Sequence, residues 1–404
     1  MKIGIIREGK NPPDRRVAFT PEQCLEIQQK YPSIQCVVQP SAIRCIPDEA
    51  YQQKGIALQE NLEECDVLFG VKEVPIPELI AQKTYFFFSH TIKKQPYNRN
   101  LLCTVLEKNI RLIDYECLKN TQGKRVVAFG RFAGLVGAYE GFLVFGQKSG
   151  LFSLKPPQNC QNLEEMSQEL RKMVLPPLKI ILTGSGRVGK GALEILKIAG
   201  IEAVSPEDFI SKNFDKPVFT HLGSKDYYKA TKPERVHADF YEYPEDFESY
   251  FFQYLRHAHL FISAHYWNPK APALFSADDL ETPHQLQVVA DITCDIAGSV
   301  PCTLKTSTIT EPVYDYVPSL RNIADAYTSP QNISIMAIDN LPTALPYDAS
   351  QSFGEQLIKE VIPVLVGLGD EKVLARATIA EKGQLGSSFT YLQDYVSGCY
   401  EEVR

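Results

Sequence analysis

Short apolar runs alternate with amphipathic stretches over roughly the first 115 residues. Thr20 and Pro21 have the residue types of an N-cap and first helical position, so a helix is expected to begin there. Strands that alternate with helices predict a mostly parallel sheet with helices on both faces. The predicted strands of this part are 2–7, 36–39, 66–71, 85–89 and 109–115.

The α/β pattern starts a second time after a glycine-rich apolar stretch at 124–150, which predicts a closely packed helix. A buried strand is expected at 178–183, followed by a helix over 193–199. Residues 206–255 are aromatic, acidic and irregular, and 339–404 are expected to be mostly helical. Further predicted elements are a helix at 163–173 and strands at 260–264 and 286–291.

The strand at 178–183 leads directly into a GxGxxG loop formed by Gly184, Gly186 and Gly189. The strand before it and the helix after it favour a dinucleotide-binding turn over a glycine-rich turn in an unrelated α/β domain. The first glycine permits the tight turn, the second lets a pyrophosphate approach, and the third lets helix and strand pack closely. The predicted cofactor-binding loop is Gly184, Ser185, Gly186, Arg187, Val188 and Gly189.

An acidic residue usually binds the adenosine ribose about 20 residues after the first glycine. Here the predicted second strand ends at Ser205, and Glu207 and Asp208 come slightly later. A serine would not repel a 2′-phosphate. The sequence therefore favours NADP over NAD modestly and leaves both open.

Length and composition limit the class of protein. At ~150 residues per domain, 404 residues predict two domains. The net charge of −7 disfavours nucleic-acid binding. No membrane span is expected, because Arg131 and Glu140 interrupt the most apolar region. Ten cysteines without a CxxC pair and a start without signal-peptide layout predict a cytoplasmic protein with reduced thiols.

Charged side chains follow several predicted strands, at the sheet edge where open α/β proteins bind ligands. Lys72 and His90 are the natural proton-transfer pair, since burial and neighbours can bring both near neutral pKa. Any one such residue alone is more often a solvated loop charge. Guanidinium groups that could clamp carboxylates are those of Arg16, Arg125 and Arg131.

The histidines at 257, 259 and 265 could suggest a metal. Two of them flank a predicted strand, and no acidic ligand stands at a useful spacing. We therefore expect no metal site.

Several blocks resemble the lysine-forming saccharopine dehydrogenase family, and within it the lysine–2-oxoglutarate reductase domain of aminoadipic semialdehyde synthase. Alanine dehydrogenase is a more distant relative. These blocks include 70–75 (GVKEVP), 87–93 (FFSHTIK), 113–116 (IDYE), 123–130 (GKRVVAFG) and 290–295 (ADITCD).

This resemblance implies an enzyme that joins lysine to 2-oxoglutarate and reduces the imine to saccharopine with NAD or NADP. Lys72 and His90 match the acid–base pair. Asp291 and Thr293 match positions at the nicotinamide end of the cofactor site. Residues matching substrate contacts or the carboxylates that tune them are Arg16, Lys72, Arg125, Glu73 and Glu116.

The family fold implied is two Rossmann-like domains with parallel sheets and a cleft between them. We place a discontinuous substrate domain at 1–136 plus 326–404 and a dinucleotide-binding domain at 137–325. Two alternatives remain: an NAD-dependent saccharopine dehydrogenase working in the lysine-forming direction, and a non-catalytic dinucleotide-binding sensor. The oligomeric state stays open.

Overall fold

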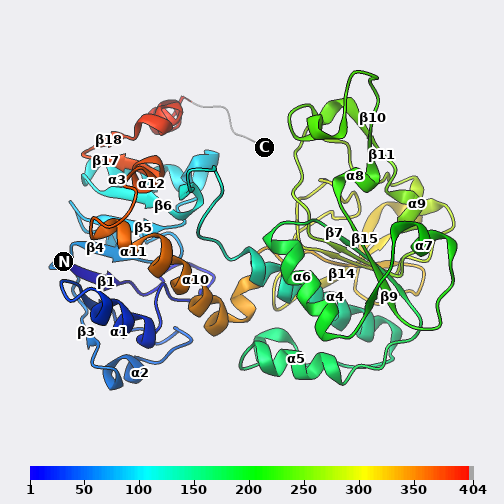
Figure 1. Ribbon diagram of the computed structural model, residues 1–404, viewed down its shortest axis with the longest axis horizontal. Helices are drawn as coiled ribbons and strands as arrows, with labels where there is room; N and C mark the ends of the chain where they lie inside the picture. The colour runs from blue at the N-terminus through cyan, green and yellow to red at the C-terminus, as the bar shows by residue number, and fades with distance from the viewer. Residues whose placement is uncertain (400–404) are drawn as a thin grey trace. The chain divides into compact units, whose positions relative to one another are not determined.

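The computed structural model describes residues 1–399 and divides into two compact units. Unit 1 is formed by residues 1–129 together with the chain from residue 346. Unit 2 is formed by residues 130–345. Figure 1 shows blue, cyan and orange-red segments in the first unit and green to yellow segments in the second.

Unit 1 is built on an eight-stranded sheet of order β18-β17-β6-β5-β4-β1-β2-β3. The six strands from the first part of the chain are parallel, and β17 and β18 add an antiparallel edge. The strands are β1 (Lys2–Ile5), β2 (Gln35–Val38), β3 (Ala57–Leu58), β4 (Val67–Phe69), β5 (Thr84–Phe87), β6 (Arg111–Asp114), β17 (Thr378–Glu381) and β18 (Gln384–Leu385).

Both faces of this sheet are buried because its strands are apolar at consecutive positions. Along β5, Phe86 packs into one apolar cluster, while Tyr85 and Phe87 pack into the cluster on the opposite face. Helices cover the two faces, as the alternating pattern predicts. They are α1 (Pro21–Lys30), α2 (Asp48–Gln53), α3 (Arg99–Glu107), α10 (Pro346–Glu360), α11 (Ile362–Leu365), α12 (Lys372–Ala377) and α13 (Gln393–Ser397).

Unit 2 holds a second eight-stranded sheet, of order β15-β14-β16-β13-β12-β7-β9-β8. It is parallel from β16 to β8, and β14 and β15 form an antiparallel edge. The strands are β7 (Lys179–Thr183), β8 (Glu202–Ala203), β9 (Val218–Leu222), β12 (Leu260–Ser263), β13 (Val288–Asp291), β14 (Val313–Val317), β15 (Asn322–Ala324) and β16 (Ile333–Met336).

The predicted fold class, α/β with two Rossmann-like domains and mostly parallel sheets, is confirmed. The unit bounds fall at 129/130 and 345/346 rather than at 136/137 and 325/326. One helix, α4 (Gly130–Ser149), runs unbroken through position 136, and β16 pairs with β13 of the second sheet. Both segments therefore belong to unit 2.

The described part of the segment 339–404 is mostly helical, as expected, but Thr378–Glu381 and Gln384–Leu385 form a hairpin within it. Lys382 and Gly383 form its two-residue loop, and both have positive φ. This is the backbone of a tight hairpin turn. Strand β17 then pairs with β6 and extends the first sheet (Figure 1). Among residues 1–399, no helix has the length and apolar character that a bilayer crossing requires.

The predicted close packing of the glycine-rich helix α4 occurs against α6 (Arg187–Ile198). A Cβ at Gly134 would lie 1.9 Å from the Val188 carbonyl oxygen, and a Cβ at Gly191 would lie 2.0 Å from that of Arg131. Only glycine permits this approach of backbone to backbone. Helix α6, which follows the glycine loop, is thus packed directly against α4.

We expect Gly134→Ala to destabilise the protein by about 3 kcal/mol or more, because the new methyl group overlaps backbone atoms that cannot rotate away. Ser149→Ala, an exposed position in the same helix, should change stability by less than about 0.5 kcal/mol. Denaturant unfolding of both variants tests this, and equal stabilities would contradict the packing described.

Candidate functional site

Charged and polar side chains gather where the parallel strands of unit 1 end. Lys72 follows β4, His90 follows β5, and Asp114 closes β6. The Tyr115 hydroxyl donates to the Gly70 carbonyl at 2.9 Å, which ties the end of β6 to the end of β4. The sequence prediction that these residues share one sheet edge agrees with this strand order.

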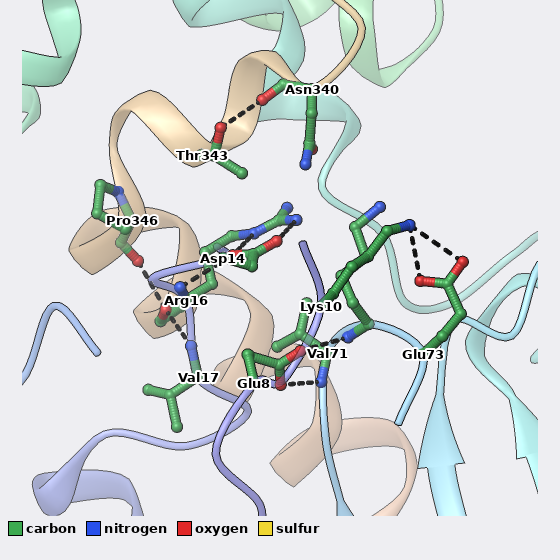
Figure 2. A network of polar contacts seen from close by, with 12 residues as sticks. Glu8, Lys10, Asp14, Arg16, Val17, Val71, Glu73, Asn340, Thr343 and Pro346 are labelled. Carbon is green, nitrogen blue, oxygen red and sulfur yellow. Dashed lines mark hydrogen bonds and ion pairs between the residues drawn. The ribbon is translucent and has the colours of Figure 1, made fainter. Parts of the chain in front are cut away.

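Glu73 is the shared hydrogen-bond partner of His90 and Lys10 in this cluster. Its carboxylate contacts Nδ1 of His90 at 2.5 Å and accepts from Nζ of Lys10 at 2.8 Å. Burial disfavours the charged carboxylate, yet the hydrogen bonds from His90 and Lys10 prevail and lower the pKa of Glu73 to about 2. Glu73 therefore stays ionised and fixes the orientation of the imidazole. Figure 2 shows the Lys10–Glu73 pair.

Lys72 is half-buried beside other positive charges. Burial, and then the charges of Arg16 and Lys10, lower its pKa from the ordinary lysine value. Its backbone N–H donates to the Glu8 carboxylate at 2.7 Å, and so does the N–H of Val71 (Figure 2). Burial and the charge of Asp14 raise the pKa of Glu8 to about 8. The lysine is thereby held in place and made easier to deprotonate.

Arg16 is buried and forms a two-point ion pair with Asp14, at 3.0 Å from Nε and 2.6 Å from Nη2. The ring of Phe129 lies 4.1 Å from its guanidinium carbon. Burial opposes ionisation of Asp14, but the Arg16 charge keeps the pKa of that carboxyl below its usual range. Asp14 thus holds one edge of the Arg16 guanidinium, and the Phe129 ring covers one of its faces.

Arg125 and Glu116 also lie in unit 1, with their charged groups 3.7 Å apart, and Arg125 lies over the ring of Phe88. Arg131 is placed differently, near the start of α4 in unit 2. Its guanidinium binds the Glu194 carboxylate at 2.9 and 2.7 Å. Arg131 and Glu194 both belong to unit 2, whereas Arg16 and Lys72 belong to unit 1.

Asp114 is a buried carboxylate at the end of β6, and the sequence pattern gave it no role. It accepts from the backbone N–H groups of Ser89 and Glu116 and from the Ser89 hydroxyl. Burial raises its pKa. These bonds fix the residue before His90, whose own backbone is left-handed at φ 52°. Asp114 therefore positions the loop that carries the histidine.

The glycine loop of unit 2 has the geometry of a dinucleotide-binding turn. Gly184 has φ +95°, and a Cβ there would lie 2.2 Å from the Ala264 carbonyl oxygen. A Cβ at Gly189 would lie 1.8 Å from the Gly184 carbonyl oxygen, whereas one at Gly186 would meet nothing within 4 Å. The turn, the close helix packing and the open approach for a phosphate are all present, so the residues fit a dinucleotide.

This loop borders a cavity of about 910 Å³, a size typical of cofactor sites. Of the nine predicted cofactor residues, Gly189, Asp291 and Ser205 do not line it. Asp291 is buried behind it and accepts from the hydroxyls of Thr293 and Thr303, each at 2.6 Å. The predicted residues that line the cavity are Gly184, Ser185, Gly186, Arg187, Val188 and Thr293.

Ser205 does not line the cavity, because of the strand order. It caps α7 (Pro206–Ser211), beside β8 at the outer edge of the sheet, and accepts from the Asp208 N–H at 3.1 Å. On this side of the sheet, the strand that pairs with β7 is β9 rather than β8. The chain that follows β9 supplies Gly223, Ser224 and Lys225 to the cavity wall, and the sequence analysis missed these residues.

His265 also lines the cavity, whereas the other two histidines of its group do not. Its ring nitrogens contact the hydroxyls of Thr183 at 2.8 Å and Ser299 at 3.0 Å, and burial lowers its pKa to about 4. Across the described residues, no three histidine, cysteine or acidic side chains are placed to hold a metal. The His265 imidazole is therefore uncharged at neutral pH and lines the cavity.

We expect Gly186→Ala to fold as well as the parent protein but to bind dinucleotide at least about 10-fold more weakly, because its methyl group projects where the phosphates approach. Gly189→Ala is the matched variant, and its methyl group would overlap the Gly184 carbonyl and destabilise the fold. Thermal unfolding and cofactor titration separate the two effects. Normal cofactor affinity in Gly186→Ala would contradict the site.

The low pKa of Glu73 makes a prediction for stability against pH. Because the pKa falls from 4.5 to about 2 on folding, the contribution is complete above about pH 4.5 and is lost as the pH falls towards 2. At pH 3 the loss is about 2 kcal/mol. His90→Ala should reduce the loss between pH 7 and 3 by about 1 kcal/mol, measured by urea unfolding.

Arg7→Ala is the control, since it breaks the exposed pair with Glu60 and should leave the pH dependence unchanged. An unchanged pH dependence in His90→Ala would show that the histidine does not stabilise the Glu73 carboxylate.

Comparisons with known proteins agree with this geometry. Residues 4–136 match the family "Alanine dehydrogenase/PNT, N-terminal domain". Among solved structures, an L-alanine dehydrogenase covers 99% of this chain with TM-score 0.66 and 17% identity, all of that chain being matched. The transhydrogenase from Sinorhizobium meliloti covers 95% of this chain, and 98% of its own, with TM-score 0.59 and 13% identity. These two similarities show the fold.

Sequence relatives narrow the family. The mitochondrial alpha-aminoadipic semialdehyde synthase of Mus musculus is 30% identical over 97% of this chain and 47% of its own length. The Arabidopsis thaliana protein of that name is 29% identical, over 96% and 41%. The chain thus spans less than half the length of these relatives. A saccharopine dehydrogenase [NAD(+), L-lysine-forming] of Emericella nidulans is 26% identical over 88% of this chain and 90% of its own. The chain is therefore a homologue of the aminoadipic semialdehyde synthases and the lysine-forming saccharopine dehydrogenases.

Proposed function

We propose that this protein is a lysine–2-oxoglutarate reductase, which condenses L-lysine with 2-oxoglutarate and reduces the imine to saccharopine. The observation that carries the proposal is the cluster of Lys72, Glu73 and His90 in a homologue of saccharopine-metabolising enzymes. The predicted cleft between the domains, and a cytoplasmic location, remain predictions.

The chemistry needs proton transfers that this cluster can supply. The ε-amine of lysine must be neutral to attack the keto carbon, and the carbinolamine oxygen must be protonated so that it leaves as water. Lys72, with its lowered pKa, can accept a proton from the amine. His90, held by Glu73, can deliver one to the departing oxygen. The bound nicotinamide would supply the hydride for the carbon–nitrogen double bond.

Saccharopine carries three carboxylates, so the substrates require cationic partners. Arg16 and Arg125 lie in the same unit as Lys72 and are the proposed carboxylate anchors. Arg16 is fixed by Asp14, which favours one geometry of binding over many. Arg131 is not proposed as an anchor, since Glu194 engages its guanidinium.

The proposed cofactor is NADP rather than NAD. The residues that support this preference are not Ser205, which the sequence suggested, but residues that line the cavity. The chain after β9 supplies Ser224 and Lys225 to the cavity. Asp226 is the acidic side chain that follows them, and its carboxylate accepts from the Gly223 N–H at 2.7 Å. A lysine and a hydroxyl favour a 2′-phosphate, whereas an acidic group would favour the free ribose hydroxyls.

Two other functions remain to be tested against this one. The NAD-linked, lysine-forming saccharopine dehydrogenase would use the same residues. A dinucleotide-binding sensor would bind the cofactor without turnover. Steady-state oxidation of each reduced cofactor with lysine, ornithine or alanine plus 2-oxoglutarate separates these functions.

We expect turnover with lysine and a higher kcat/KM for NADPH than for NADH. Lys72→Met should lower kcat by about 100-fold or more while cofactor binding is retained, because Lys72 does not line the cavity. Lys54→Met, at an exposed lysine, should behave like the parent protein. Cofactor binding without turnover in the parent protein would favour the sensor, and normal turnover in Lys72→Met would refute its catalytic role.

A further inference from the structure

A small hairpin stands apart from the eight-stranded sheet of unit 2. Strands β10 (Tyr228–Ala230) and β11 (Phe247–Ser249) pair only with each other and follow α8 (Ser224–Tyr227), as Figure 1 shows. Residues 231–246 connect them. The sequence analysis found no role for this aromatic and acidic stretch, which begins directly after the wall of the cavity.

The connecting segment is held in place by its own side chains. Phe240 stacks on Tyr228 with ring centroids 4.5 Å apart and meets Phe247 edge-on at 5.3 Å. Asp246 binds both Lys232 and Arg235. Aromatic contacts of this kind contribute about 0.5–1.5 kcal/mol each beyond area burial. The segment therefore presents a defined surface to the cavity.

His237 lies on that surface, its ring parallel to that of Phe240. Its Nε2 is 3.1 Å from the Ser224 hydroxyl, which lies 3.5 Å from the hydroxyl of Tyr241. All of these residues line the cavity together with Lys225. The buried Nδ1 of His237 has no hydrogen-bond partner.

The polar groups at this part of the cavity are an ammonium, an imidazole and two hydroxyls. The neighbouring carboxylate of Asp226 is turned onto the Gly223 N–H. Asp295 is the acidic side chain among the lining residues, and it comes from the chain after β13. A dianionic group can accept hydrogen bonds from the Lys225 ammonium, the His237 imidazole and the Ser224 hydroxyl.

We infer that the hairpin sets cofactor specificity, with His237 joining Ser224 and Lys225 to bind the 2′-phosphate of the adenosine ribose. Tyr241 lines the cavity with a mostly exposed side chain, and its ring would stack on the adenine. This inference rests on the proposed dinucleotide site and assigns its phosphate recognition to a segment outside the Rossmann core. His237 and Tyr241 are thus specificity-determining residues.

The test uses two small probes, 2′,5′-ADP and 5′-AMP, which differ only in the 2′-phosphate. Trp267 is the one tryptophan of the sequence and lines the cavity, so its fluorescence reports binding. We expect the parent protein to bind 2′,5′-ADP at least about 10-fold more tightly than 5′-AMP. Calorimetry on the full chain gives the same constants independently.

His237→Ala and Lys225→Ala should each weaken 2′,5′-ADP binding about 10-fold and leave 5′-AMP binding within 2-fold. Tyr241→Ala should weaken both probes equally, since stacking does not sense the phosphate. His257→Ala and Lys229→Ala remove the same residue types outside the cavity lining and should change neither constant. His237→Phe, which keeps a ring against Phe240 but removes the ring nitrogens, serves the same purpose should the alanine variant not fold.

Equal binding of the two probes by the parent protein, or equal losses for both probes in His237→Ala, would overturn the inference. A turnover assay with lysine and 2-oxoglutarate distinguishes failure of this inference from failure of the proposed function. Selective loss of 2′,5′-ADP binding without any lysine-dependent turnover would keep the phosphate site and refute the reaction. Lysine-dependent turnover by the parent protein, together with unaltered probe binding in His237→Ala, would keep the reaction and refute the phosphate site.

Discussion

The carbonyl oxygen of Gly184 lies 1.8 Å from where a Cβ at position 189 would stand, and unit 2 depends on that close approach. It sets the first turn of α6 directly on the end of β7. The same turn of α6 packs against α4, because Gly134 of α4 leaves room for the Val188 carbonyl. Three backbones thus meet with no side chain between them. The result is a fixed helix N-terminus with an open position at Gly186, which is what phosphate binding requires.

Unit 1 buries several charged side chains, which must be paired or neutralised inside it. Arg16 and Asp14 are almost completely buried and neutralise each other, and Glu73 is shared by Lys10 and His90. Glu8 is buried beside Asp14, so its pKa rises to about 8 and it is mostly protonated at neutral pH. The pKa values of Glu73 and Glu8 are therefore separated widely although both lie at one sheet edge. Such separation is how a fold assigns distinct acid and base roles to similar groups.

Sequence reasoning located the parts of this molecule that local pattern determines. The apolar strands through 183, the N-cap at Thr20 and the GxGxxG turn all follow from short-range spacing, and the capping box at Thr20 is present. The grouping of Lys72, Glu73 and His90 could also be predicted, because parallel strands end at one edge. The pairing of Arg131 with Glu194 could not, since it joins residues 63 positions apart. The return of β17 to the first sheet likewise depends on a long-range pairing.

The absence of Ser205 from the cavity lining has a physical cause that the sequence did contain. A strand in the interior of a parallel sheet must be apolar on both faces. Strand β8 has two exposed residues, Glu202 and Ala203, whereas four of the five residues of β9 are buried. The shorter strand can therefore occupy only the edge, and β9 takes the place beside β7. Because β9 runs on through α8 into the hairpin, the wall of the cavity and the aromatic segment above it form one continuous piece of chain. Strand burial thus determines which residues line the cavity, and the order of strands along the chain does not.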